Sequence, residues 1–186
     1  MVPLMSLWLP IVLSAAFVFI ASSIIHMLLR YHRHDFTKLP NEDAVMAALR
    51  PLDIPPGDYM MPNAQSMKEM KDPAFLEKFH KGPVAMLTVM RGGSMSMGKN
   101  LAGWFIYCLV VSIFAAYIAG RALPPGSPYL QVHRFAGATA FVGYVLASWQ
   151  SSVWYKRKWT TNVRNTIDGL IYGFLTGGTF GAFWPK

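Results

Sequence analysis

Four stretches of the chain are almost free of charged residues, and polar segments separate them. An α-helix rises about 1.5 Å per residue, so roughly 20 apolar residues are needed to cross the ~30 Å hydrocarbon core of a bilayer. Each stretch approaches this length, which predicts an all-α integral membrane protein built on a four-transmembrane-helix bundle. The predicted helices cover residues 5–29, 101–120, 135–154 and 167–184.

The same pattern divides the chain into three parts. Residues 1–29 contain the first transmembrane helix, residues 30–99 form a polar cap segment, and residues 100–186 hold the other three helices. In the cap, Asn41 and Asp72 are predicted to begin short helices that stop at Pro51 and before Gly82. Residues 84–90 are typical of a strand, and the two glycines that follow would turn it back into one β-hairpin.

Composition and charge agree with a membrane protein and predict its orientation. The chain is 53% hydrophobic and 14% charged, and fourteen of its 17 lysines and arginines lie between helices one and two or between helices three and four. Cytoplasmic loops carry such an excess of positive charge. We therefore expect a plasma (inner) membrane protein with both termini outside and residues 30–99 and 156–164 cytoplasmic. Anionic lipid accounts for the net charge of +8, so we expect lipid contacts and no nucleic-acid partner.

Small residues recur at one-turn spacing in two of the predicted helices. In lipid, helices associate largely through close approach of their backbones at such positions. The stripes predict packing inside one bundle, and an interface between copies or a pore-lining face is the alternative. The residues are Gly169, Gly173, Gly177 and Gly181 in the fourth helix and Ala136, Ala140, Gly143 and Ala147 in the third.

Asp168 is the one acid within or beside the predicted bundle. Ionisable residues at membrane depth are costly, which makes them candidates for proton or cation handling. At the cytoplasmic start of the fourth helix, however, Asp168 would also favour the positive helix end and could pair with Arg164 one turn earlier. The structural interpretation and the ion-site hypothesis both stay open.

Several residues have side chains that bind metals. His26 ends the first helix, and His32, His34 and Asp35 follow it in an H-x-H-D cluster that could supply ligands to a divalent metal. Met95 and Met97 have a spacing typical of copper handling, within a methionine-rich segment. Solvated histidines beside a membrane and adaptable methionine packing are the alternatives.

No catalytic motif is recognisable, which argues against an enzyme, and we predict no cofactor. The leading hypothesis is a non-enzymatic accessory or assembly subunit, either homo-oligomeric or part of a larger membrane complex. A small oligomeric channel or transporter is the second hypothesis. A membrane protein that binds a metal or haem is the third.

Overall fold

The computed structural model describes residues 1–93 and 96–186, and these residues are mostly helical with one small sheet. The chain forms two compact units. Unit 1 combines Met1–Thr37 with Ser96–Lys186, and unit 2 is Lys38–Met95.

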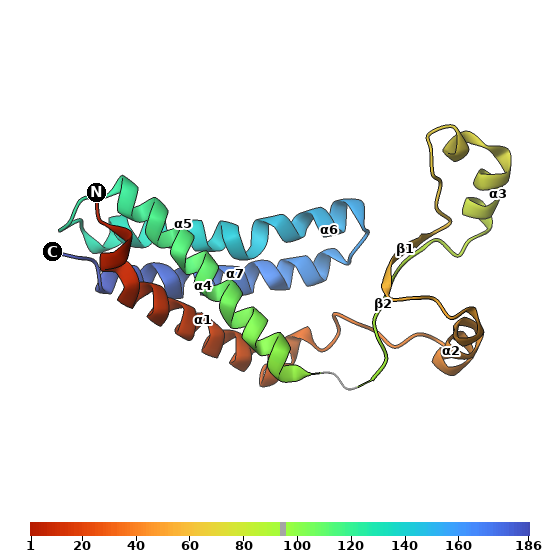
Figure 1. Ribbon diagram of the computed structural model, residues 1–186, viewed down its shortest axis with the longest axis horizontal. Coiled ribbons are helices and arrows are strands. Elements are labelled where there is room, and N and C mark those ends of the chain that lie inside the picture. The colour runs from red at the N-terminus through yellow and green to blue at the C-terminus, as the bar shows by residue number, and fades with distance from the viewer. Residues whose placement is uncertain (94–95) are drawn as a thin grey trace. The chain divides into compact units, whose positions relative to one another are not determined.

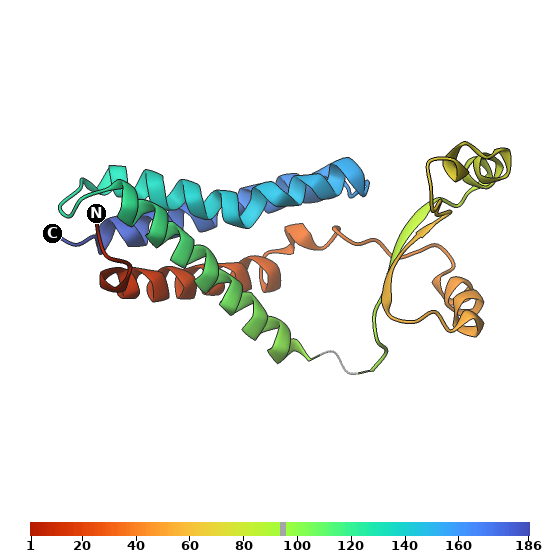
Figure 2. The same ribbon diagram turned by 45° about the horizontal axis from the view of Figure 1, so that its top comes forward.

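Unit 1 is a bundle of four long helices. Helices α5 and α7 run side by side in both ribbon views, and α1 packs against α4 and α7 (Figures 1 and 2). A short helix α6 continues the direction of α5 after the 3-10 turn Leu146–Ser148. The bounds are α1 (Trp8–Met27), α4 (Met97–Ala122), α5 (Tyr129–Val145), α6 (Trp149–Trp154) and α7 (Trp159–Ala182), and a 3-10 turn, Leu4–Leu7, precedes α1.

Two of the described helical segments, Leu4–Met27 and Met97–Ala122, are long and apolar enough to cross a membrane. The other two predicted spans do not meet this test. Helix α5 has 17 residues before its hydrogen bonding changes to the 3-10 turn. Helix α7 begins at Trp159, well before the predicted start at residue 167, and so includes Arg164 in addition to Asp168. Length and composition therefore support membrane association through two helices.

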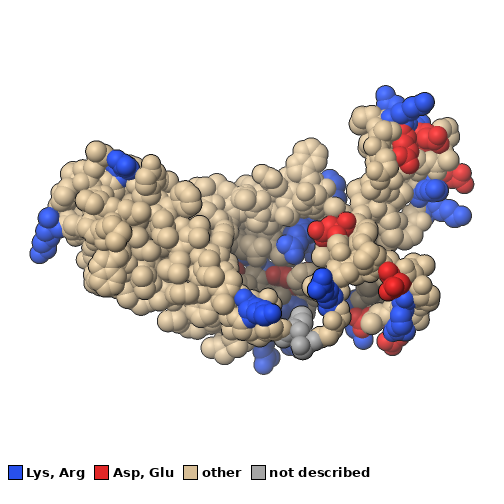
Figure 3. Space-filling model, viewed as in Figure 1, with Lys and Arg blue, Asp and Glu red and all other residues tan. Residues whose placement is uncertain are grey.

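The interior of unit 1 is built largely from small and polar side chains. Ala116 and Ala119 are fully buried, and the buried Ser14 hydroxyl donates to the Ser112 hydroxyl over 3.0 Å. Many large apolar side chains face outward, such as Phe114 at 59% and Phe174 at 64% exposed, although Leu7 and Phe180 are fully buried. Figure 3 shows a face of unit 1 on which Lys and Arg lie toward the ends and the surface between them is uncharged. This distribution is the reverse of that in a water-soluble bundle.

Unit 2 holds two short helices and a two-stranded antiparallel sheet. They are α2 (Glu42–Leu49), α3 (Pro73–Lys81), β1 (Gly57–Met61) and β2 (Ala85–Val89), with 3-10 turns at Arg50–Leu52 and Glu69–Lys71. Gly57 pairs with Val89 and Met61 with Ala85. The strand predicted at 84–90 thus pairs with an earlier segment and does not turn back at the glycines that follow it. Helix α3 and its flanking loops connect the two strands.

The caps of the short helices follow the sequence in one case and not in the other. The Asp72 carboxylate accepts a hydrogen bond from the Ala74 amide over 2.8 Å, as expected for an N-cap. Asn41 makes no such bond, because its backbone is left-handed (φ 52°) and α2 begins without a side-chain cap. Among the described residues of unit 2, no side chain is buried.

Candidate functional site

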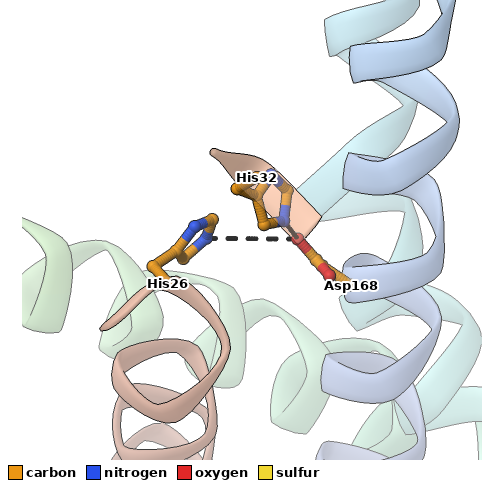
Figure 4. A group of neighbouring side chains, drawn as sticks. All are labelled: His26, His32 and Asp168. Carbon is orange, nitrogen blue, oxygen red and sulfur yellow. Dashed lines mark hydrogen bonds and ion pairs between the residues drawn. The ribbon is translucent and has the colours of Figure 1, made fainter. Parts of the chain in front are cut away.

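Three side chains from three elements meet at the end of the bundle where α1 finishes. His26 lies in the last turn of α1, His32 in the 3-10 turn η2 (Arg30–His32), and Asp168 on α7. The chain leaves α1 after Met27 and η2 brings His32 back over His26, with the two rings 4.4 Å apart. Figure 4 shows both imidazoles directed toward the Asp168 carboxylate.

The distances fit a cluster of ligand atoms. His32 Nε2 lies 2.7 Å from Asp168 Oδ2, and His26 Nε2 lies 4.0 Å from the same oxygen. The ligand atoms of all three residues lie within 4.8 Å of one another. Asp168 is almost fully buried, His32 is nearly so, and half of the His26 side chain is exposed. The cluster is therefore anchored inside the bundle and open on the His26 side.

A second carboxylate orients His32. Asp35 Oδ2 lies 2.6 Å from His32 Nδ1, while Asp35 Oδ1 accepts hydrogen bonds from Arg164 Nη1 over 2.7 Å and from the Thr161 hydroxyl over 3.3 Å. Burial alone would raise the pKa of Asp35, but the hydrogen bonds from His32 and Arg164 hold that pKa below its ordinary value. Asp35 is therefore anionic at neutral pH, so Nδ1 of His32 donates to it and Nε2 faces Asp168.

One oxygen of the buried Asp168 carboxylate has no partner among the described residues. Oδ1 is shielded from solvent and makes no hydrogen bond. A buried acceptor left unpaired costs about 1–3 kcal/mol, and more when it is charged. Buried carboxylate oxygens are normally paired, so Asp168 Oδ1 is available to a ligand.

Two cavities reach this cluster from the surface of unit 1. One has a volume of about 440 Å³ and is lined by His26, His32, Arg30 and Arg33 among others. The other, of about 330 Å³, is lined by the same two histidines together with residues at the start of α7. An ion or small molecule can therefore reach His26 and His32 from outside.

The structure brings together only part of the residue set predicted to bind metals. His26 and His32 join Asp168, whereas His34 is exposed and lies outside the cluster. Met97 is exposed at the start of α4, and Met95 lies outside the described residues. The expected ion pair between Arg164 and Asp168 is wrong, because the Arg164 guanidinium forms its ion pair with Asp35 instead.

The glycines of α7 face α5 closely. A side-chain carbon on Gly173 would lie 2.9 Å from the Gly137 carbonyl oxygen, and one on Gly177 would lie 2.6 Å from the His133 carbonyl oxygen. At the two ends, Gly169 meets Val145 and Gly181 meets the ring of Tyr129. The glycine stripe of α7 is therefore covered by α5 of the same chain.

The partner face on α5 differs from the small-residue stripe expected there. Ala136 and Ala140 are buried, but Gly143 meets Val111 of α4 and Ala147 is exposed in the 3-10 turn. The face that meets α7 includes Tyr129, His133, Gly137, Phe141 and Val145. Glycines on one helix leave room for large side chains on the other, so a small stripe need not oppose another small stripe.

The orienting role of Asp35 was not recognised from the sequence, which suggested it only as an oxygen ligand. Its position three residues after His32 is a local signal, since residues at that spacing meet in a helical turn. The contact with Arg164 carried no such signal, because 128 intervening positions separate residues 35 and 164 in the sequence.

No family model matches the chain, and no curated protein or solved structure shows significant similarity to it.

Proposed function

We propose that this chain is a four-span integral membrane protein that binds a divalent transition-metal ion through His26, His32 and Asp168. Support for four spans comes from the packing of unit 1, since α5 and α7 form one bundle with the two helices apolar enough to cross a membrane. Its outward-facing aromatic and aliphatic side chains suit a lipid solvent, and its small and polar interior suits helix association in lipid. The uneven distribution of basic residues supports placing the cluster on the cytoplasmic side.

The metal assignment depends on one observation above all. Three ligand atoms converge within 4.8 Å, and Asp168, which supplies one of them, has a second buried oxygen without a partner among the described residues. Two imidazoles and a carboxylate are a donor set that Zn²⁺ and Fe²⁺ accept while keeping coordination positions open. On binding, His32 Nε2 would exchange its hydrogen bond to Asp168 for the metal, and Asp35 would hold the opposite ring nitrogen, as second carboxylates do at many metal sites.

Zinc titration of the purified protein tests this proposal. Protein in mild detergent, stripped with a chelator, is titrated with Zn²⁺ by calorimetry, and one ion per chain is expected. His26→Ala is the most informative variant, because its half-exposed side chain can be removed with little effect on folding. We expect it to weaken zinc binding by more than the roughly tenfold that loss of a supporting partner costs.

His34→Ala is the matched control, since it removes a nearby histidine that lies outside the cluster. Its zinc affinity should equal that of the wild type. Absence of stoichiometric zinc binding by the wild type, or an equal loss in both histidine variants, would contradict the proposal.

A role as an accessory subunit is a second candidate, and unit 2 favours it. No described side chain in unit 2 is buried, and Met60, Met67, Met86 and Met90 are each at least 44% exposed. Exposed methionines make adaptable contact surfaces. The glycine stripe supports self-association less than the sequence suggested, because α5 already covers it. Chains that co-purify in stoichiometric amount, identified by mass spectrometry, would support this role.

A further inference from the structure

The cavity of about 330 Å³ beside the His–Asp cluster is lined by two permanent cations, Arg157 and Lys158, and by one carboxylate, Asp35. Arg157 and Lys158 line it just before α7 begins, and Thr161 and Asn165 line it from the first turns of that helix. His26 and His32 form the side toward the cluster. The cavity therefore joins the proposed metal site to a group of hydrogen-bond donors (Figure 4 shows the histidines).

Few negative charges oppose these donors. Unit 1 contains two acids, Asp35 and Asp168. Asp35 lines the cavity, but its carboxylate is already engaged by His32, Arg164 and Thr161, and Asp168 is buried. Neither acid forms an ion pair with Arg157 or Lys158 among the described residues. The Arg157 guanidinium lies over the Phe36 ring, 5.8 Å from its centroid, and a ring does not neutralise its charge, so both cations can bind an anion.

Helix geometry adds to the same preference. Thr161, Asn165 and Asp168 follow one another at spacings of four and three, so they share a face of α7 that runs from the cavity to the cluster. The start of a long helix also carries partial positive charge, which attracts anions. Arginine binds phosphate oxygens through two parallel hydrogen bonds, and lysine adds a point charge.

We infer that this cavity binds a phosphate group, held by Arg157 and Lys158, with one of its oxygens directed toward the open coordination position of the metal. The inference rests on the proposed metal site for the role of that oxygen, whereas the cavity and its basic lining are independent of it. The phosphate could belong to a small phosphorylated molecule or to a phospholipid of the adjacent leaflet.

Phosphate binding is measured in two arms on zinc-loaded protein. In the first arm, protein in detergent is titrated with inorganic phosphate, and the shift in melting temperature gives the apparent affinity. In the second arm, the protein is placed in nanodiscs of phosphatidylcholine with or without phosphatidic acid. A response in the first arm identifies a free phosphate ligand, and a response in the second arm alone identifies a lipid headgroup.

The double variant Arg157→Gln/Lys158→Gln tests the named residues. It should weaken the responding arm by about tenfold or more, because each charge-assisted hydrogen bond is strong. Lys99→Gln/Arg121→Gln is the control, since it removes the same charge from α4 and should leave the affinity unchanged. The inference is overturned if neither arm responds, or if both double variants lose affinity equally.

Failure of the metal site and failure of the phosphate site can be told apart. The phosphate titration is repeated on wild-type protein stripped of zinc with a chelator, which keeps every residue of the cavity lining. Binding that still depends on this pair would support the phosphate cavity even if zinc binding failed. Phosphate binding that disappears together with zinc would show that the cavity has no affinity of its own and would overturn the inference.

Discussion

At the scale of single residues, Asp35 connects three segments of unit 1. It accepts hydrogen bonds from His32 after α1 and from Thr161 and Arg164 in the first turns of α7. These contacts fix the His32 ring so that Nε2 points at Asp168. Asp35 is therefore a positioning residue for the proposed metal site rather than a ligand.

Asp35→Asn is expected to weaken zinc binding by roughly 10- to 100-fold, the usual cost of losing a carboxylate that supports a metal-bound histidine. Calorimetry with Zn²⁺ measures the effect. Asp35→Glu should recover part of the zinc affinity, because it restores the carboxylate. If the role of Asp35 were purely structural, Asp35→Glu would not bind zinc more tightly than Asp35→Asn. Asp43→Asn in α2 serves as a control with unchanged affinity.

At the scale of elements, α7 has two distinct faces of interest. One face presents glycines to α5, and the other presents Thr161, Asn165 and Asp168 toward the cavity and the cluster. Close packing against α5 holds α7 in position and so determines where Asp168 meets the histidines. The packing face thus supports the site without contributing a ligand to it.

Two adjacent glycines of α7 allow a direct test of this packing. A side-chain carbon at Gly177 would lie 2.6 Å from the His133 backbone oxygen, whereas one at Gly178 would meet only the Tyr129 hydroxyl at 3.4 Å. Gly177→Ala is expected to destabilise the protein by about 1–3 kcal/mol, as overpacking does. Gly178→Ala should leave stability unchanged or raise it. Thermal unfolding in detergent compares them, and equal melting temperatures would contradict the α5–α7 contact.

At the scale of the whole molecule, the proposed four spans place the loop between α4 and α5 on the opposite side of the membrane from the segment between α6 and α7. Pro125 lies in the first and Tyr155 in the second, and both are exposed. The native Cys108 is fully buried and should give little background in thiol labelling.

Cysteine labelling of intact cells checks this arrangement. A membrane-impermeant maleimide is expected to label Pro125→Cys from outside and to label Tyr155→Cys only after the cells are opened. The reverse pattern would invert the predicted orientation while keeping the spans. Labelling of both positions in intact cells would contradict four spans.

Part of the site was visible in the sequence, and part was not. His26, His32 and Asp168 were each candidates on their own, because imidazoles bind metals and an ionisable residue at membrane depth is costly, although each also had a structural explanation. Which of them meet was not predictable: His34 had the same local signal as His32 but is exposed and lies outside the cluster. Arg164 was expected beside Asp168 from helical spacing, yet Asp35 from a distant segment provides a closer partner.

Local hydropathy along the chain was enough to predict four helical segments in unit 1 and membrane association through its apolar helices, although α5 and α7 begin earlier than predicted. Tertiary structure decided which faces meet: the glycines of α7 against large residues of α5, the strand at 85–89 against 57–61, and His26 and His32 around Asp168. Such contacts depend on how segments far apart in the chain fold back on one another. No local pattern of residues encodes them, because each segment is compatible with several partners until packing selects one.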